Sequence, residues 1–309
     1  MISSFPPENP DLHFQTELKS IDNSDFIDGI TPIKSSIVDR VIQIIMFIVC
    51  FGWLRLFILF LMTILFIILE LPILFFPGSE YIKKWGVFVA STYLRGILFC
   101  FGLIYIRKTG EIENNTRVFA FNHVTLFDGP VVFLCKQFRI VSMIEMSRIP
   151  LVNSLMRAIS TIFIDRTIKN GSSKCVDEAI RDNNSLPVGI APEGKTCKGT
   201  YMFKFHTSAF ISNYRFQPVS IRYRTLLGFG KIGYSWTVGG IFEFIWRCSC
   251  VPFGIAEVHF LPSINPNTLN NKSAEERAII CQLAIANDLG VLASNRSNRE
   301  IYKKKLKTK

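Results

Sequence analysis

The sequence predicts an α/β protein with a mixed, mostly parallel sheet flanked by helices and an N-terminal membrane-embedded helical segment. Two observations lead to this fold class. After Lys108, short β-branched runs alternate with helix-like segments, a pattern typical of strands connected through helices. Before it, an apolar run extends from Val41 to Pro77, and the chain of 309 residues is 49% hydrophobic with a mean hydropathy of +0.30. We therefore expect a membrane-associated protein.

Charge and cysteine content narrow the class of partner. The formal net charge is +11, which suits nucleic acid, anionic lipid headgroups or a polyphosphate ligand. No zinc-finger spacing, helix-turn-helix pattern or aromatic-rich signature accompanies it, so we expect no nucleic-acid partner. The eight cysteines are scattered, and Cys248 and Cys250 are too close for a C-x-x-C motif, so we expect reduced thiols and no metal site.

Composition divides the chain into four segments. Residues 1–39 are polar, acidic and proline-containing, and we expect a mobile leader without a secretory signal. Residues 40–107 contain membrane-associated helices, and residues 108–262 form the α/β domain that we expect to be catalytic. Residues 263–309 form a helical and basic tail.

The apolar run from Val41 to Pro77 has an ambiguous length. One perpendicular helix needs about 20 residues, and two full spans with a turn need about 45. A hairpin of two short helices dipping into one leaflet, with its tip near Gly52 to Arg55, and one long tilted span both stay open. Basic residues flank both ends, which favours a hairpin with both ends in the cytosol. These residues are Lys34, Arg40, Lys83 and Lys84.

A second apolar stretch extends from Trp85 to Ile106, with Arg95 at its centre. A charge in mid-span is costly in hydrocarbon. We therefore predict an interfacial or core helix that runs into a strand, in preference to the alternative of a further membrane span.

The α/β domain contains six predicted strands and four predicted helices, and a fifth helix is predicted in the tail. The strands are Arg117–Phe121, Arg139–Ile144, Thr161–Asp165, Val188–Ala191, Gln217–Tyr223 and Ala256–Leu261. The helices are Val131–Gln137, Leu151–Ile159, Ser173–Arg181, Met202–Ser212 and Ala274–Leu289.

The stretch FAFNHVTLFDGP places His123 five positions before Asp128, directly after a predicted strand. Aspartate followed by Gly129 and Pro130 is also typical of a helix N-terminus, so Asp128 has an ordinary structural interpretation. The alternative is a catalytic pair, in which the carboxylate holds one ring nitrogen and the other nitrogen faces a ligand hydroxyl. Such a histidine could act as a general base at neutral pH.

Three further stretches bear on this choice. ISTIFIDR ends a strand with Arg166, IAPEGKTCKG places Pro-Glu-Gly at residues 192–194 after another strand, and FQPVSIRY carries Pro218 into a third. Each has a structural interpretation by itself: a solvated strand end, a turn and the start of an edge strand.

Together, in this order, these four blocks resemble the glycerolipid acyltransferase family, the PlsC-type enzymes. The stretches APEGKTCKGTYMFKFHTSAF, QPVSIRYR and the tryptophan-containing segment from Ser235 to Ile264 are similar to the lysophosphatidylcholine and lysophosphatidylethanolamine acyltransferase branch. The resemblance implies transfer of an acyl chain from acyl-CoA, a co-substrate, to the free hydroxyl of a lysophospholipid. It implies no further cofactor.

The resemblance also implies roles for individual residues. His123 is the expected general base, oriented by Asp128. Arg166 is expected to contact the acceptor phosphate, and Glu193 to position backbone amides or a basic neighbour. The expected substrate-binding residues are Asn122, Arg166, Glu193, Gly194 and Lys195.

Two departures from the family pattern leave the acceptor open. Lys195 replaces the threonine or serine expected after Glu-Gly, and His206 and Ser208 stand where relatives of the branch have lysine and glycine. Lysophosphatidic acid or glycerol 3-phosphate is therefore an alternative acceptor, and a weakly catalytic scaffold at a membrane or lipid droplet is an alternative function. His13, His206 and His259 are expected to be non-catalytic, with His206 on a helix and His259 on a strand.

The basic tail suggests a location. Lys305 and Lys307 resemble a cytosolic dilysine signal for retrieval to the endoplasmic reticulum, and a plain basic tail near anionic lipid is an equal interpretation. We expect a catalytic domain facing the cytosol, with a lipid droplet as a second location.

Overall fold

The computed structural model describes residues 2–3, 15–75, 79–165, 167–168, 171–226, 233–237, 240–269, 272–298 and 300. The strands are β1 (Ile2–Ser3), β2 (Leu103–Thr109), β3 (Val118–Phe121), β4 (Arg139–Met143), β5 (Ile162–Ile164), β6 (Val188–Ile190), β7 (Tyr201–Met202), β8 (Phe216–Thr225), β9 (Gly254–Phe260) and β10 (Leu292–Ala293). The α-helices are α1 (Asn23–Ile30), α2 (Ile37–Val49), α3 (Gly52–Phe75), α4 (Glu80–Cys100), α5 (Asp128–Cys135), α6 (Pro150–Ala158), α7 (Gly171–Arg181), α8 (Ile241–Ser249) and α9 (Ala274–Leu289).

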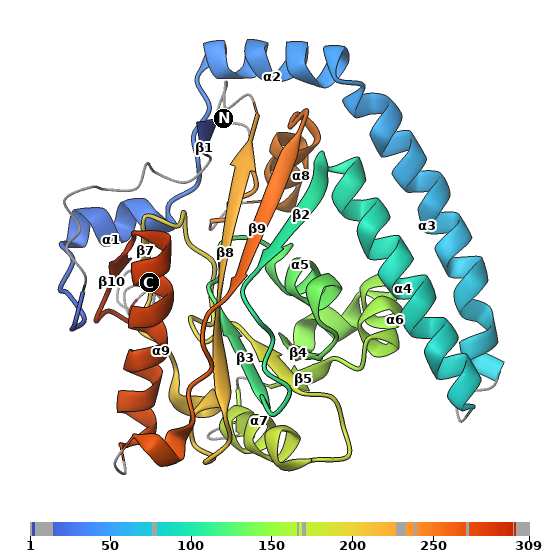
Figure 1. Cartoon of the computed structure of the whole chain (residues 1–309). Helices are drawn as coiled ribbons and strands as arrows, with labels where there is room; N and C mark the ends of the chain where they lie inside the picture. The colour runs from blue at the N-terminus through green and yellow to red at the C-terminus, as the bar shows by residue number, and fades with distance from the viewer. Residues whose placement is uncertain are drawn as a thin grey trace.

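The main sheet has the strand order β2-β9-β8-β3-β6-β4-β5, with β1 paired to β8 (Figure 1). Neighbours along this path run parallel except β8 and β9. A second, two-stranded sheet pairs β10 with β7. The predicted mixed and mostly parallel sheet flanked by helices is confirmed.

Both faces of the sheet centre are buried. Along β3, Phe119 and Phe121 belong to a core cluster shared with residues of α4, α5 and α8, whereas Val118 and Ala120 belong to a second cluster shared with α7 and α9. Successive side chains of a strand point to opposite faces, so a strand covered on both sides is apolar throughout. This explains why Phe119–Phe121 is apolar at every position.

The predicted helix over Met202–Ser212 is wrong. The chain there forms β7 and then a 3₁₀ turn at Thr207–Ala209. Tyr201 and Phe203 belong to one buried cluster and Met202 between them to another, which is the two-residue period of an extended chain. The other predicted helices and all six predicted strands are present, with starts within three residues and ends within two residues of those expected.

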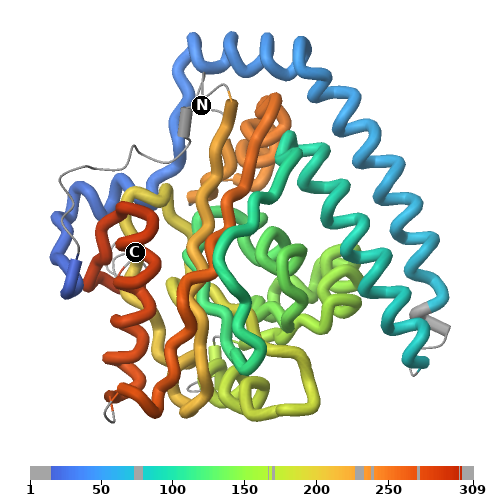
Figure 2. Tube along the Cα trace, viewed as in Figure 1, coloured from blue at the N-terminus to red at the C-terminus, as the bar shows by residue number. Residues whose placement is uncertain are grey.

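The apolar N-terminal region forms α2, α3 and α4. The helical conformation is interrupted at Phe51, next to the expected tip of the hairpin. Helix α3 packs along α4, whereas α2 lies across one end of the molecule (Figures 1 and 2). Residues Gly52–Pro72 form the one candidate membrane span among the described residues, and 11% of its most apolar window is buried inside the protein. Helix α4 leads into β2, so the predicted helix that runs into a strand is confirmed.

Arg55 joins α3 to the α/β domain. Its guanidinium donates to Ser249 O at 2.8 Å and to Val251 O at 2.9 Å, at the end of α8. The C-terminal carbonyls of a helix have no partner within the helix, so a cation is favourable there. This contact accounts for a charge inside the apolar run.

The leader packs on the domain from Gln15 onward, which differs from the expected mobile segment. Gln15 bonds Val291 and Ala293 through its side chain, and Phe26 of α1 is 1% exposed against Tyr201 and Phe203. A polar composition does not reveal these few anchoring residues. For residues 4–14, which lie outside the described part, mobility stays a prediction.

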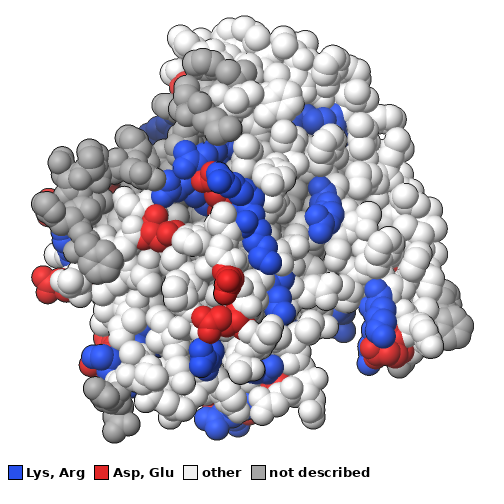
Figure 3. All heavy atoms as spheres, in the orientation of Figure 1, with Lys and Arg blue, Asp and Glu red and all other residues white. Residues whose placement is uncertain are grey.

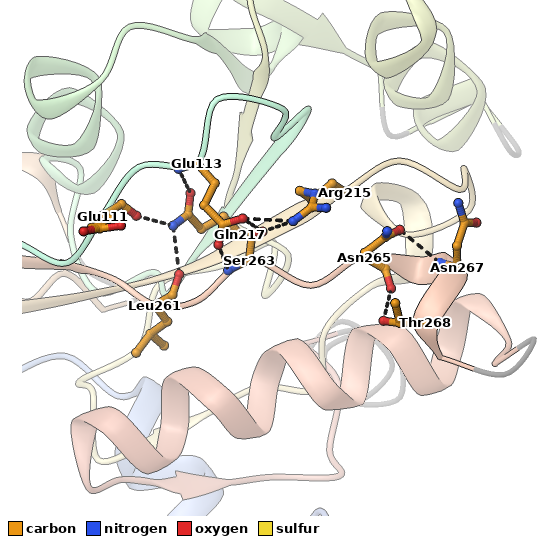
Figure 4. Close-up of polar contacts among 9 residues, drawn as sticks. All are labelled: Glu111, Glu113, Arg215, Gln217, Leu261, Ser263, Asn265, Asn267 and Thr268. Atoms are coloured by element: carbon orange, nitrogen blue, oxygen red, sulfur yellow. Dashed lines mark hydrogen bonds and ion pairs between the residues drawn. The ribbon is translucent and has the colours of Figure 1, made fainter.

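A polar network fastens the start of β8 to its neighbours (Figure 4). The buried Gln217 donates to Glu111 O at 2.7 Å and to Leu261 O at 2.8 Å, while Glu113 bonds Arg215 and Ser263. These contacts join the loop after β2 to the segment after β9. They lie at the amino end of β8, and the candidate site lies toward its carboxyl end.

Candidate active site

His123 lies in the loop between β3 and α5. Strand β3 runs parallel to β8, which points in Figure 1 toward the end of the sheet crossed by α2. Asn122 fixes the start of the loop, because its amide donates to Ile221 O at 3.0 Å and accepts from Ile221 N at 2.7 Å. The side chain therefore continues the pairing of β3 with β8 after the backbone has turned away.

His123 and Asp128 form the predicted pair. The Nδ1 atom of His123 lies 2.9 Å from Asp128 Oδ2, which also accepts from the N–H groups of Val124 at 2.7 Å and Thr125 at 2.8 Å. Tyr223 OH donates to Asp128 Oδ1 at 2.8 Å. The carboxylate is fully buried at the start of α5, so it both bonds the loop at the helix N-terminus and orients the imidazole.

This geometry sets the tautomer of the histidine. An ionised carboxylate only accepts hydrogen bonds, so Nδ1 carries the hydrogen and Nε2 of the neutral ring keeps its lone pair. The His123 side chain is 27% exposed, whereas Asp128 is 0% exposed. The pair can therefore accept a proton from a hydroxyl group that approaches Nε2.

Glu193 holds the backbone of the histidine. It is 1% exposed, and its two oxygens accept the N–H of His123 at 2.7 Å and that of Phe203 at 2.9 Å. Burial raises the pKa of Glu193 to about 8. The carboxyl group thus positions backbone amides, as the sequence suggested.

Gly194 adopts a positive φ of 66° in the turn that follows. A Cβ atom there would lie 2.9 Å from Asn298 Nδ2, which donates to Glu193 O at 2.8 Å. Asn298 also contacts His206, whose Nε2 lies 3.1 Å from Asn298 Oδ1. The turn therefore needs glycine both for its backbone angle and for the close approach of Asn298.

The predicted substrate-binding residues occupy different places. Asn122 and Glu193 are buried and bonded to backbone groups, so neither is exposed to a substrate in this structure. Lys195 is partly exposed in the loop after Gly194. Arg166 lies outside the described residues, and its phosphate contact stays a prediction.

Two of the other histidines have partners of their own. His259 lies on β9, as predicted, with Nδ1 2.8 Å from Asp288 Oδ1. His206 precedes a 3₁₀ turn rather than lying on a helix. His13 lies outside the described residues.

Tyr223 and Asn298 were not predicted. Their contacts with Asp128 and Glu193 span 95 and 105 residues of sequence. Alternation in QPVSIRY places Tyr223 on one face of its strand, which is the only local signal for it. Asn298 belongs to the tail and has no such signal.

A groove in the described part of the chain lies elsewhere. It has a volume of about 290 Å³ and is lined by residues of β2, β8, β9 and α9. Arg222 and Arg224 line it, and alternation along β8 places them on the face opposite Tyr223. Basic and acidic atoms mix over this part of Figure 3, and Arg224 and Arg107 contact Glu257 at 2.8 and 3.8 Å. We therefore assign this groove no part in the His123 site.

Comparison with known proteins adds a family. Residues 104–222 match the family model described as Acyltransferase. This range contains β3, the His123–Asp128 pair, the Glu193 turn and most of β8.

Two curated relatives illustrate the similarity. The lysophospholipid acyltransferase LPCAT4 of Mus musculus is 28% identical over 207 residues, which is 65% of this chain and 39% of that protein. The lysophospholipid acyltransferase LPEAT2 of Arabidopsis thaliana is 27% identical over 208 residues, 66% of this chain and 38% of that protein. The chain thus matches about two fifths of the length of these relatives.

A solved structure shares the fold. The crystal structure of the 1-acyl-sn-glycerophosphate (LPA) acyltransferase PlsC from Thermotoga maritima has a TM-score of 0.50 at 16% identity, covering 76% of this chain and 96% of that one. The family model, the curated relatives and this fold agree with the resemblance seen in the sequence. Residues 104–222 thus form an acyltransferase domain, and the chain is similar to lysophospholipid acyltransferases.

Proposed function

We propose that the protein transfers a fatty acyl chain from acyl-CoA to the free hydroxyl of a lysophospholipid, of the choline or ethanolamine type, in phospholipid synthesis or remodelling. The observation that carries this proposal is the His123–Asp128 pair, held at 2.9 Å within the acyltransferase match. Similarity to lysophospholipid acyltransferases supports the acceptor class.

The proposed step needs one base and no covalent enzyme intermediate. His123 Nε2 takes the proton of the acceptor hydroxyl as its oxygen attacks the thioester carbonyl. The tetrahedral intermediate then collapses, the C–S bond breaks, and the proton on His123 passes to the sulfur of the leaving CoA. Asp128 holds the ring and balances the charge of the imidazolium. The products are a diacyl phospholipid and free CoA.

We propose that the protein acts at the membrane of the endoplasmic reticulum, with its catalytic domain in the cytosol. The exposed apolar side chains of α2 and α3 support the membrane location. All eight cysteines are free thiols, which agrees with a reducing compartment. Glycosylation of Asn114 or Asn183 in cells would contradict the cytosolic side.

The test is release of CoA thiol by membranes that contain the protein. Each assay combines an acyl-CoA with one acceptor: lysophosphatidylcholine, lysophosphatidylethanolamine, lysophosphatidic acid or glycerol 3-phosphate. We expect acceptor-dependent release with the first two. Release only with lysophosphatidic acid or glycerol 3-phosphate would change the acceptor class. No release with any acceptor would favour the alternative function, a weakly catalytic scaffold at a membrane or lipid droplet.

A further inference from the structure

The end of α1 lies directly against the loop that follows the Pro-Glu-Gly turn. Lys198 donates its backbone N–H to Gly29 O at 2.9 Å, and its Nζ lies 2.9 Å from Asp28 Oδ1. Tyr201 OH donates to Phe26 O at 2.9 Å. A carboxylate from the N-terminal segment is thereby fixed beside this loop.

A short series of contacts connects this carboxylate to the backbone of the proposed base. Cys197, the residue before Lys198, donates its N–H to His123 O at 3.3 Å. The Lys198 side chain is 21% exposed and that of Asp28 is 68% exposed. The Asp28 carboxylate therefore bonds the lysine with one oxygen and is also exposed to solvent.

The loop offers opposite charges side by side. Lys195 and Lys198 lie within four residues of each other, and Asp28 is beside the second of them. A phosphate bound by lysines here would have a carboxylate next to it. That neighbour repels a phosphate that carries no other group, and it attracts a cation attached to the phosphate through a short linker.

We infer that Asp28 selects zwitterionic acceptors by contacting the ammonium group of the lysophospholipid headgroup, while the lysines of the loop contact the phosphate. The inference rests on the proposed function and narrows it. The ethanolamine headgroup binds Asp28 more strongly than the choline headgroup does, because its ammonium can donate a hydrogen bond to Asp28 and the quaternary nitrogen of choline cannot. Lysophosphatidic acid and glycerol 3-phosphate have no ammonium to contact Asp28.

The experiment measures kcat/KM of the full chain in membranes for lysophosphatidylethanolamine, lysophosphatidylcholine and lysophosphatidic acid. In Asp28→Asn the amide still accepts from Lys198, so the loop keeps its position. We expect kcat/KM to fall by about two- to fivefold for the ethanolamine acceptor, because exposed ion pairs contribute little. The fall should be smaller for choline, and lysophosphatidic acid should show none.

Two variants act as controls. Asp25→Asn removes a charge from the first turn of the same helix, and it should leave the acceptor ratios unchanged. Asp28→Glu keeps the charge and should retain the preference. Unchanged ratios in Asp28→Asn, or a rise for lysophosphatidic acid with no fall for the ethanolamine acceptor, would overturn the inference alone. A wild-type protein that is inactive on every acceptor would overturn the proposed function and this inference with it.

Discussion

At the scale of single residues, the candidate site depends on buried groups that position exposed ones. Asp128 and Glu193 are both buried, and each holds His123, one through the ring and the other through the backbone N–H. In addition to its contact with His123, Asp128 accepts hydrogen bonds from Val124, Thr125 and Tyr223. This arrangement leaves Nε2 of His123 as the atom that can meet a substrate.

The raised pKa of Glu193 predicts a pH dependence of stability. An unfolded glutamate titrates near 4.3, and burial raises the pKa of Glu193 in the folded protein to about 8. Between these values the folded state holds a proton that the unfolded state has lost, so the free energy of unfolding falls as pH rises and levels off above about 8. Denaturant unfolding at a series of pH values should show this fall in the wild type. Its persistence in Glu193→Gln would contradict the assignment.

Sequence alone revealed only the local part of this site. His123 and Asp128 are five positions apart, and the Pro-Glu-Gly turn is contiguous, so their residue types and order predict them. Tyr223 and Asn298 reach the site through the folding of distant segments; alternation along its strand is the only local signal for Tyr223, and Asn298 has none. The burial of Glu193 also required the structure, because exposure follows from packing on every side.

At the scale of elements, the leader behaves as part of the domain. Phe26 is 1% exposed, and the Arg296 guanidinium lies 3.9 Å from the centre of its ring. In Phe26→Ala we expect the docking of α1 to weaken by about 3–5 kcal/mol, the usual cost of truncating a buried phenylalanine. Limited proteolysis should then cut residues 15–36 while the rest of the chain stays intact.

The control for this prediction is on the same helix. Ile27 is 44% exposed, so Ile27→Ala should leave the proteolysis pattern of the wild type. Equal protection of all three proteins would show that the leader does not depend on the Phe26 contact.

The elements that the sequence predicted well are those with one clear period. Strands buried on both faces are short apolar runs between turn residues, and α9 begins with the Ser273–Glu276 capping box and ends at Gly290 in the left-handed conformation. The segment after Tyr201 misled the prediction because its spaced phenylalanines fit either period. The leader misled it because three apolar anchors, Ile21, Phe26 and Ile30, lie among polar residues.

At the scale of the whole molecule, one end and one flank carry α2 and α3, which show few charged atoms in Figure 3. Their exposed side chains include Ile37, Ile45, Phe57 and Leu65. The loop after β3 opens toward the same end of the sheet (Figure 1). This arrangement would bring the site close to a bilayer in which the acceptor lies.

Membrane attachment should therefore be apolar rather than electrostatic. Salt screens charges but not hydrophobic contacts, so we expect the protein to stay with membranes in high salt and to leave them in detergent. Leu65→Lys should weaken retention, because this side chain is 54% exposed on α3. Leu186→Lys, at an exposed leucine of the α/β domain, is the matched control. Release of the wild type by high salt would show that the net charge holds it instead.

The central claim is that His123 is the base of an acyl transfer, and a second histidine allows a matched test. His259 contacts Asp288 at 2.8 Å, much as His123 contacts Asp128 at 2.9 Å, but it lies beside the groove on the opposite face of the sheet from Tyr223. The measurement is acceptor-dependent CoA release by membranes with equal amounts of wild type, His123→Ala and His259→Ala. We predict that His123→Ala lowers kcat by about 10²- to 10⁴-fold and that His259→Ala keeps most of the wild-type rate. Equal rates in the wild type and His123→Ala would contradict the account.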